Sequence, residues 1–355
     1  MVMIMPILPE TKCDRIVPSA SKPCVYYIPG ESGFAGFCSL PNQFRCIEAI
    51  KAKAPRLSHS SINTWLRCRR RWYIEQIKGI VRRETMMSSS LKMGTIWDRI
   101  KQDAFARGSW DVYDGLEIIH DMADALALDE KDGLKLRALV RALGTLEYSP
   151  EKCATNVKAT YYYNKPLAEM FVSGKLDAVP LDNKPYFYEV KLSSRPDWYT
   201  EITNIESQVA TYFLFDERFD FVVMDITRIP DLRQTKTKTD ESDFGYEERT
   251  YDDILKRPSH YFIGWNKDKR RWGKPFYRRE FDLEDIAKRY RVVAGEIKQA
   301  FIDDACYANP TACLTPFECD YKPICSTGGV SEILFRERTK DEIDEANSAE
   351  SDGEA

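Results

Sequence analysis

The chain of 355 residues lacks any apolar run that approaches the length of a membrane span. Its apolar start, Met1–Leu8, has neither the basic beginning nor the long apolar core of a signal peptide. These two absences argue against a membrane protein and favour a cytoplasmic one. We therefore expect the ten cysteines to be free or metal-bound rather than joined in disulfides.

The chain also lacks a strong excess of charge of either sign. Lys and Arg number 52 and Asp and Glu 56, which gives a formal net charge of -4. The segment Thr339–Ala355 holds seven of the acidic residues and one lysine, so the rest has 51 basic and 49 acidic residues. Composition therefore neither requires nor excludes a nucleic-acid partner, and local patches must decide.

Both ends of the chain have the composition of irregular segments. Residues 1–55 form a leader in which Pro, Gly and Ser recur, and the acidic segment 331–355 is expected to be disordered. The leader lacks the close C-x-x-C pair that marks a zinc site strongly. A structural zinc site and four ordinary thiols are the two interpretations of its cysteines. These cysteines are Cys13, Cys24, Cys38 and Cys46.

Two short strands are predicted in the middle of the chain. Met170–Ala178 and Tyr186–Leu192 are apolar and aromatic, and Leu181–Pro185 has the composition of the turn that joins them. Further strands are predicted at Asn156–Tyr163 and Asp220–Ile226. A family resemblance that is described below implies that the four strands share one sheet and that residues 56–330 form one domain.

Three charged side chains stand where a plain core strand would carry apolar ones: Asp177, Glu189 and Lys191. Glu189 and Lys191 share one face of their strand, and Asp177 reaches that face if the strands are neighbours. Two carboxylates can hold a hard divalent cation, and a nearby lysine can position water or offset phosphate charge. The alternative is a solvated Glu189–Lys191 pair with Asp177 in a turn.

The motifs around these residues resemble the PD-(D/E)XK nuclease superfamily, and in particular its RecB-like branch. Gly174–Asp177 matches G-x-(I/L)-D, Glu189–Lys191 matches a strand that ends in E-x-K, and Gln208–Tyr212 matches a helix with Q-x-x-x-Y. The resemblance implies the fold of that superfamily: an αβββαβ core with a mixed sheet flanked by helices.

The resemblance also implies a role for each motif residue. A Mg²⁺ or Mn²⁺ ion is held by Asp177, Glu189 and the carbonyl of Val190. Lys191 assists the attacking water, and two helix residues orient the substrate strand. The implied catalytic set is Asp177, Glu189, Lys191, Gln208 and Tyr212.

A second predicted helix begins within Lys92–Asp98 and carries a departure from the family pattern. Relatives have G-x-x-x-H here, with the histidine as an extra metal ligand, whereas this chain has Asp98 four residues after Gly94. A carboxylate is a competent ligand for magnesium or manganese, so Asp98 is a candidate further ligand. The alternative is a helix-surface aspartate paired with Arg99 or Lys101.

A helix that begins near Leu57 resembles the N-terminal helix of the RecB-like family, which carries a cysteine followed by proline. Cys68 stands at the cysteine position and Arg69 replaces the proline. The arginines from Arg67 to Arg83 either bind phosphates or form a solvated helix face. Lys267–Arg279 interleaves basic and aromatic residues, which is typical of a nucleic-acid groove or of a hairpin with aromatics facing the core.

Four cysteines among prolines and aromatics near the C-terminus suggest metal thiolates: Cys306, Cys313, Cys319 and Cys325. The segment resembles the iron–sulfur staple of RecB-like and bacteriophage-encoded nucleases. The resemblance implies a structural four-iron four-sulfur (4Fe–4S) cluster with these ligands: Cys68, Cys313, Cys319 and Cys325. A local site that includes Cys306, with zinc, and a set of free thiols are the alternatives.

The resemblance as a whole implies a metal-dependent deoxyribonuclease, in particular an exonuclease that leaves 5′-phosphates. Such an enzyme serves recombination, repair or phage DNA metabolism in a bacterial cell or a phage-infected host. DNA is the expected partner, with recombination or single-strand-binding proteins as further ones and no membrane. The competing hypothesis is a catalytically impaired DNA-binding or assembly protein that keeps the fold and the cluster, which Asp98 in place of histidine favours.

Overall fold

The computed structural model describes residues 57–162, 171–202, 207–235, 241–303, 305–315, 318–340 and 342, and the short strands β1 (Tyr27–Ile28) and β2 (Phe37–Cys38). The side chains of the four leader cysteines and residues 343–355 lie outside this part. The leader zinc site and the acidic end of the chain therefore stay predictions. No helix within the described ranges is long and apolar enough to cross a membrane.

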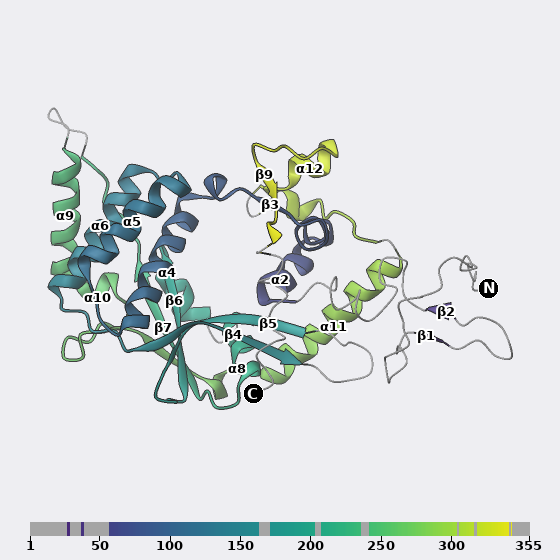
Figure 1. Cartoon of the computed structure of the whole chain (residues 1–355), viewed down its shortest axis with the longest axis horizontal. Coiled ribbons are helices and arrows are strands. Elements are labelled where there is room, and N and C mark those ends of the chain that lie inside the picture. Colours follow the sequence, from purple (N-terminus) through teal and green to yellow (C-terminus); the bar gives the residue numbers. More distant parts are fainter. Residues whose placement is uncertain are drawn as a thin grey trace.

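A mixed five-stranded sheet lies at the centre of the molecule (Figure 1). Its strands lie side by side in chain order: β4 (Cys153–Tyr162), β5 (Phe171–Pro180), β6 (Tyr186–Ser193), β7 (Phe221–Arg228) and β8 (Lys274–Tyr277). β6 and β7 run parallel, and the other neighbours run antiparallel. The four predicted strands are confirmed with small shifts at their ends.

Helices precede and interrupt the strands in the order expected. The helix α4 (Ser89–Arg107) comes before β4, and α7 (Pro196–Ile202) and α8 (Ser207–Phe215) connect β6 to β7. A crossover of this kind is required because β6 and β7 are parallel. The expected arrangement, a mixed sheet flanked by helices with one helix before three strands and another before the fourth, is therefore confirmed.

The remaining elements surround this centre. They are α2 (His59–Arg67), α3 (Arg69–Trp72), η2 (Tyr73–Ile77), β3 (Ile80–Arg82), η3 (Glu84–Met86), α5 (Val112–Leu126), α6 (Glu130–Thr145), α9 (Asp243–Lys256), α10 (Pro258–Tyr261), η4 (Arg278–Glu280), α11 (Leu283–Ile302), η5 (Thr311–Cys313), α12 (Lys322–Thr327) and β9 (Phe335–Glu337). Figure 1 shows α4, α5, α6 and α9 gathered at one end of the sheet and α2, α12 and β9 near the other.

Each face of the sheet has its own apolar core. On one face α4, α6 and α10 bury Trp97, Leu139 and Tyr261. On the other face α2, α8 and α11 bury apolar side chains that include Trp65 and Phe213. The sheet therefore lies between two layers of helices, and side chains from both layers can reach the same strand end.

The start of α2 is fixed to the sheet. Ser58 caps the helix through reciprocal hydrogen bonds with Ser61, and Leu57 forms a β-bridge to Val172 of β5. The amide of Ser173 donates to the carbonyl of Leu57 over 2.8 Å. These contacts place the N-terminal helix, and with it Cys68, relative to β5.

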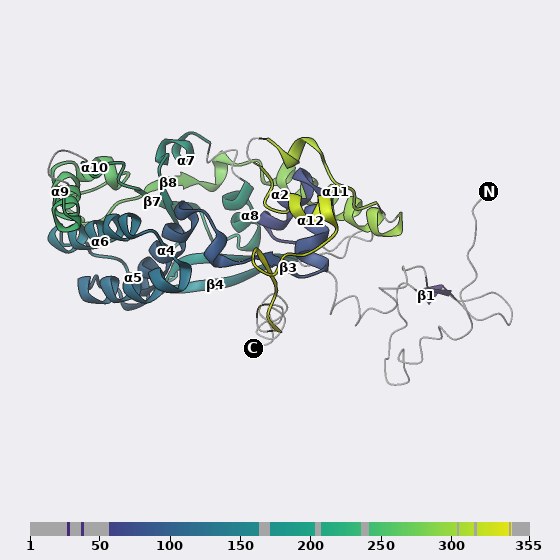
Figure 2. The same cartoon turned by 90° about the horizontal axis from the view of Figure 1, so that it is seen from above.

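The C-terminal segment is structured further than expected. β9 pairs antiparallel with β3, and Phe335 is 1% exposed in a small core with Ile74, Tyr321 and Ile324. Figure 2 shows α12 lying over α2 and α11. The predicted disorder from residue 331 is therefore wrong for β9, because one buried phenylalanine and pairing with the distant strand β3 hold it in place.

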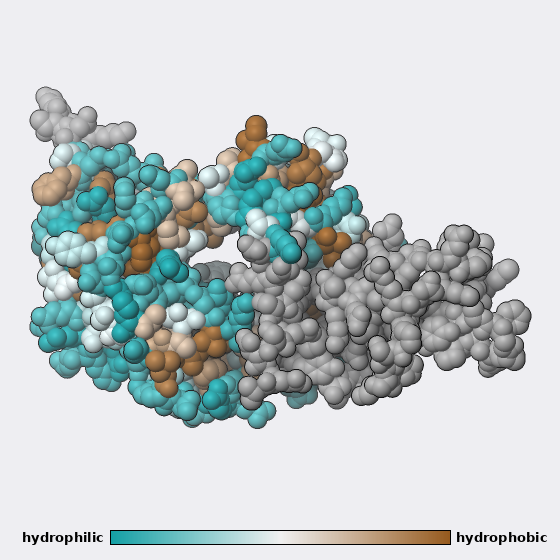
Figure 3. Space-filling view, viewed as in Figure 1, coloured by the Kyte–Doolittle hydropathy of each residue, from teal (hydrophilic) through white to brown (hydrophobic). Residues whose placement is uncertain are grey.

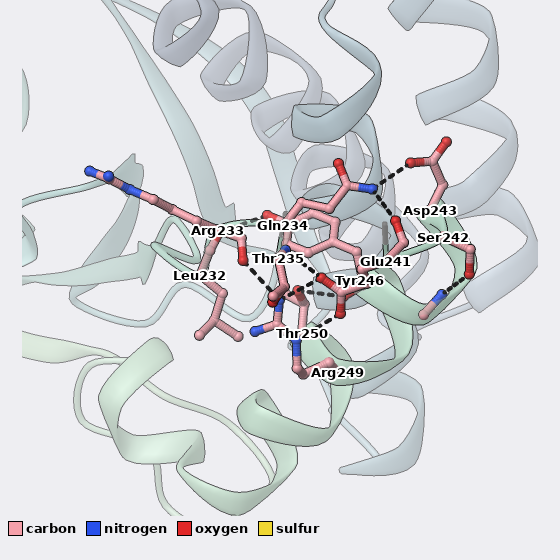
Figure 4. A network of polar contacts seen from close by, with 11 residues as sticks. Leu232, Arg233, Gln234, Thr235, Glu241, Ser242, Asp243, Tyr246, Arg249 and Thr250 are labelled. Carbon is pink, nitrogen blue, oxygen red and sulfur yellow. Dashed lines mark hydrogen bonds and ion pairs between the residues drawn. The ribbon is translucent and has the colours of Figure 1, made fainter. Parts of the chain in front are cut away.

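The polar segment before α9 is also ordered on both sides of residues 236–240. Ser242 caps α9 through its contact with the amide of Gly245, and Arg249 makes a two-point ion pair with Glu241 (Figure 4). The side-chain amide of Gln234 donates to the Glu241 carbonyl over 2.8 Å. Polarity in this segment thus reflects internal hydrogen bonding.

The sequence left two interpretations of Lys267–Arg279, a nucleic-acid groove and a hairpin with aromatic residues in the core. The structure favours the hairpin. Asn266 and Arg271 form an antiparallel bridge, and β8 follows as the last strand of the sheet. Trp272 is 4% exposed and Phe276 is 8% exposed. Trp272 and Phe276 therefore face the core and cannot stack on bases, whereas Tyr277 is 40% exposed.

Candidate active site

Three carboxylates from three elements meet at one place beside the sheet: Asp98 on α4, Asp177 on β5 and Glu189 on β6. We call them the acid cluster. Asp177 accepts a hydrogen bond from the Val190 amide over 2.7 Å, which joins β5 to β6 at this point. Glu189 is 1% exposed. The sequence predicted that these side chains share a site, and the structure brings them together.

Burial disfavours the charged forms of Asp177 and Asp98, and for Asp177 the neighbouring carboxylates add to this effect. Burial raises the pKa of Asp177 well above its ordinary value, and the charges of Glu189 and Asp98 raise it further. Burial also raises the pKa of Asp98, although Gln102, Lys191 and Lys175 act in the opposite direction. A cation placed among these groups would relieve this repulsion.

Lys191 provides an ammonium group in contact with the acid cluster. Its Nζ donates to Glu189 Oε1 and, over 3.4 Å, to Gln208 Oε1. Burial would lower the pKa of Lys191, but the carboxylates of Glu189 and Asp177 raise it overall. Lys191 is therefore protonated at neutral pH and acts as a fixed positive charge and hydrogen-bond donor.

The predicted Q-x-x-x-Y pair also lies at this place. The side-chain amide of Gln208 donates to the Tyr212 hydroxyl over 2.9 Å. Burial and the charges of Glu189 and Asp177 raise the pKa of Tyr212, so this hydroxyl stays protonated. A Cβ at Gly174 would lie 2.9 Å from Cε1 of Tyr212. The glycine of the G-x-(I/L)-D motif therefore allows α8 to rest on β5.

α4 is locked to the sheet by an ion pair that the sequence did not predict. Lys101 Nζ lies 2.7 Å from Asp225 Oδ2 and donates to the Tyr148 hydroxyl over 2.6 Å, and neither charged side chain is more than 2% exposed. The aromatic rings of Tyr148 and Trp272 enclose the ammonium at 4.1 and 4.0 Å. Lys101 is therefore not the partner of Asp98, so the alternative that pairs Asp98 with Lys101 is wrong.

The residues of the acid cluster fit a divalent cation by their chemistry. As they stand, no three His, Cys, Asp or Glu side chains in the described part of the chain are arranged to hold a metal ion. Asp177, Glu189 and Asp98 are instead turned towards protein donors. Asp98 Oδ1, however, is buried with no hydrogen-bond partner in the described structure. A buried carboxylate oxygen in this state lacks a ligand, and an all-oxygen site suits Mg²⁺ or Mn²⁺.

Four cysteines lie near one another where the N-terminal helix meets the C-terminal loops. Burial raises the pKa of the Cys325 thiol, as do Cys68, Cys313 and Cys319. The Cys319 amide donates to the Cys313 carbonyl over 3.0 Å. Cys306, which belongs to the alternative local site of the sequence analysis, packs against the apolar core on the face covered by α2, α8 and α11.

Several arginines of the basic run from Arg67 to Arg83 form ion pairs within the protein. Three of its arginines form ion pairs: Arg69 with Glu296, Arg71 with Glu75 and Arg82 with Asp320. Arg69 also lies between the rings of Trp65 and Tyr307, at 5.0 and 5.3 Å. These three arginines join the N-terminal helices to later segments, so the run is neither a uniform phosphate-binding surface nor a solvated face.

The sequence also gave no signal for two lysines beside the acid cluster. Lys175 occupies the variable position of the G-x-(I/L)-D motif, and Lys158 of β4 is its direct cross-strand partner. Both are exposed. Their partnership depends on strand register, which a motif within one strand does not reveal.

Comparison with known protein families agrees with this geometry. The family model described as PD-(D/E)XK nuclease superfamily matches residues 56–326, which is most of the chain. No curated protein and no solved structure matches the chain significantly.

Proposed function

The chain belongs to the PD-(D/E)XK nuclease superfamily, and from this premise we propose that it is a metal-dependent deoxyribonuclease that acts as an exonuclease. The observation that carries the proposal is the acid cluster with Lys191 at its side: three carboxylates and an ammonium drawn from α4, β5 and β6. Such a set is costly to bury unless it binds an ion and a charged substrate.

Each residue of the site has a proposed task. Asp177, Glu189 and the carbonyl of Val190 hold Mg²⁺ or Mn²⁺, with Asp98 as a further ligand. The bound ion polarises the phosphate and lowers the pKa of a coordinated water. Lys191 donates hydrogen bonds to the attacking water or to the phosphate.

The helix α8 orients both the lysine and the substrate strand. The contact between Gln208 Oε1 and the Lys191 ammonium restricts where that ammonium can point. The same amide donates to the Tyr212 hydroxyl. We assign Gln208 and Tyr212 to holding the strand in line for attack.

The lysines beside the acid cluster favour a polyanionic substrate. Lys158 and Lys175 lie directly opposite each other on β4 and β5, and both are exposed. A backbone phosphate that approaches this edge of the acid cluster would meet two ammonium groups. The space-filling view also shows a gap between the part of the molecule that holds α4 and the part that holds α2, which gives a strand room to approach (Figure 3).

A structural 4Fe–4S cluster is part of the proposal. Its ligands would be Cys68, Cys313, Cys319 and Cys325, and the effect of the other three thiols on the pKa of Cys325 supports this assignment. The Arg70 amide donates to the Tyr307 carbonyl over 3.0 Å, so the same two segments are already joined by hydrogen bonds. Visible absorption of thiolate–iron bands after anaerobic purification tests this, and a colourless protein that contains zinc would refute it.

The RecB-like affiliation and the cellular setting complete the proposal. The enzyme would act in the cytoplasm of a bacterial cell or a phage-infected host, in recombination, repair or phage DNA metabolism. Recombination or single-strand-binding proteins are its proposed partners. One observation favours a second candidate, a DNA-binding protein without turnover: Asp98 stands where relatives carry histidine.

The experiment uses end-labelled single- and double-stranded DNA with Mg²⁺ or Mn²⁺. We expect degradation from ends, with 5′-phosphate products, that is lost in Asp177→Ala and Lys191→Ala. Asp182→Ala is a matched control, because Asp182 is an exposed aspartate in the turn between β5 and β6. Equal cutting by all variants would reject the assigned site, and DNA binding without cutting in either metal would favour the second candidate.

A further inference from the structure

A strained residue stands opposite Asp177. Thr155 pairs with Ala178 and Val157 pairs with Leu176, so the register places Asn156 of β4 across from Asp177. Asn156 has a φ of 55°, in the left-handed region that side chains other than glycine rarely adopt. Backbone strain of this kind persists where the surroundings require it, which directs attention to the Asn156 side chain.

Two side-chain amides connect Asn156 to the acid cluster. Asn156 Nδ2 donates to Gln102 Oε1 over 2.5 Å, and Gln102 Nε2 donates to Asp98 Oδ2 over 2.6 Å. An ionised carboxylate only accepts hydrogen bonds, so Gln102 must turn its NH₂ group to Asp98 and its oxygen to Asn156. The direction of both bonds therefore follows from the charge of Asp98.

The two carboxylate oxygens of Asp98 differ in their hydrogen bonding. Oδ2 is held by Gln102, which lies one helical turn later on the same face of α4 and is 9% exposed. Oδ1 is buried and has no hydrogen-bond partner among the residues that the structure describes. Because Oδ2 is held, the carboxylate cannot rotate freely, and Oδ1 is the oxygen left to bind a ligand.

We propose that Asn156 and Gln102 are positioning residues that fix the rotation of the Asp98 carboxylate so that Oδ1 is presented to the metal ion. The inference rests on the proposed function, because it takes Asp98 as a ligand. It explains how a carboxylate can serve on α4 at the place of a histidine. A short carboxylate has two equivalent oxygens and needs an external donor to select one of them, and ligands oriented in this way bind metal more tightly.

The test measures Mn²⁺ affinity of the full-length, metal-free protein by electron paramagnetic resonance, with no DNA present. Gln102→Leu removes the donor to Oδ2, and we expect about tenfold weaker binding, the range for loss of a residue that orients a ligand. Asn156→Gly removes the amide while the glycine keeps the φ of 55°. It should weaken binding in the same direction but less.

A double-mutant cycle separates positioning from a general structural effect. Gln102→Leu should cause no further loss of Mn²⁺ affinity in an Asp98→Ala background, because its effect passes through Asp98. Gln299→Leu is the matched control: Gln299 donates to Asp303 over 2.9 Å on α11, so it removes a similar helical amide–carboxylate contact elsewhere. Thermal unfolding of the metal-free variants verifies folding, and Gln102→Met replaces Gln102→Leu if the latter does not fold.

The outcomes distinguish this inference from the proposed function. Unchanged affinity in Gln102→Leu, or an equal loss with and without Asp98, overturns the positioning role. If Asp177→Ala weakens Mn²⁺ binding and Asp98→Ala does not, the inference fails while the metal site stands. If neither variant weakens binding, the proposed metal site fails as well.

Discussion

One turn of α4 carries two charged residues in opposite situations. Lys101 is fully buried, but it has a carboxylate, a hydroxyl and aromatic rings around it, and its charge is balanced by Asp225. Asp98, three residues earlier, faces Asp177 and lies in the acid cluster, where negative charge exceeds positive. The charges of the first arrangement are balanced within the protein, whereas the second keeps an excess of negative charge unless a cation binds.

The difference separates a structural site from a functional one. The Lys101–Asp225 pair, which we call the buried pair, holds α4 against β7, so it determines where Asp98 stands. The acid cluster instead concentrates negative charge, because Glu189 and Asp98 raise the pKa of Asp177 beyond the effect of burial. Repulsion of this kind is kept at sites that bind ions and substrates, and it reduces the stability of the free protein.

The largest effect on stability should come from breaking the buried pair. Asp225→Ala leaves the Lys101 ammonium buried without its counter-charge, and we expect a loss of about 3–5 kcal/mol in the free energy of unfolding. Urea denaturation measures it. The double variant Lys101→Met/Asp225→Leu removes both charges and should recover most of that loss. If the double variant is as unstable as Asp225→Ala, the loss does not come from an uncompensated buried charge, and the explanation by charge balance is wrong.

A smaller effect of opposite sign should come from neutralising the acid cluster. Asp177→Asn removes one of the repelling charges, so the metal-free protein should gain about 0.5–2 kcal/mol of stability. The same change should abolish stabilisation by Mn²⁺, which in the wild type reaches about 2.7 kcal/mol at a free concentration 100 times Kd. Thermal unfolding with and without Mn²⁺ checks both. The control Asp182→Asn should change neither the stability of the metal-free protein nor its stabilisation by Mn²⁺. If metal-free Asp177→Asn is less stable than the wild type, the charge of Asp177 does not destabilise the fold, which contradicts the contrast drawn between the acid cluster and the buried pair.

The sequence predicted the acid cluster better than it predicted the buried pair, for a physical reason. Asp177, Glu189 and Lys191 are charges in apolar strands, so each is conspicuous in its own segment. Lys101 lies on an amphipathic helix, where a lysine ordinarily faces solvent. Only the approach of Asp225, from a strand more than a hundred residues later, turns it into a buried residue.

The same reason explains which parts of the fold were predictable. Strands such as Tyr186–Ser193 depend on a local run of apolar and aromatic residues, which the sequence displays directly. The orientation of Trp272 and Phe276 towards the core depends on the tertiary position of β8. Asn156 and Gln102 meet only after α4 packs across β4. Neither the orientation of these aromatic rings nor the contact between Asn156 and Gln102 can be predicted from the residues of a single segment.

The smallest effect in this comparison concerns pH, and its sign is opposite to that of an ordinary salt-bridged acid. The folded pKa values of Asp98 and Asp177 are raised, mainly by burial, so the folded metal-free protein holds protons that the unfolded chain has already released. The contribution of these groups to stability is therefore fully present below their unfolded pKa, about 3.9, and is lost as pH rises through the folded values.

This dependence can be measured by urea denaturation of the metal-free protein at a series of pH values. Asp98→Asn should make stability less dependent on pH over that window, because one group with a raised pKa no longer titrates. Mn²⁺ should reverse the trend, since its ligands must lose their protons and its affinity rises with pH. Asp225→Asn is not a suitable comparison, because it breaks the buried pair, so Asp182→Asn again serves as the control. An Asp98→Asn profile parallel to that of the wild type would mean that Asp98 is not part of the unbalanced charge, and the contrast within α4 would then rest on Asp177 and Glu189 alone.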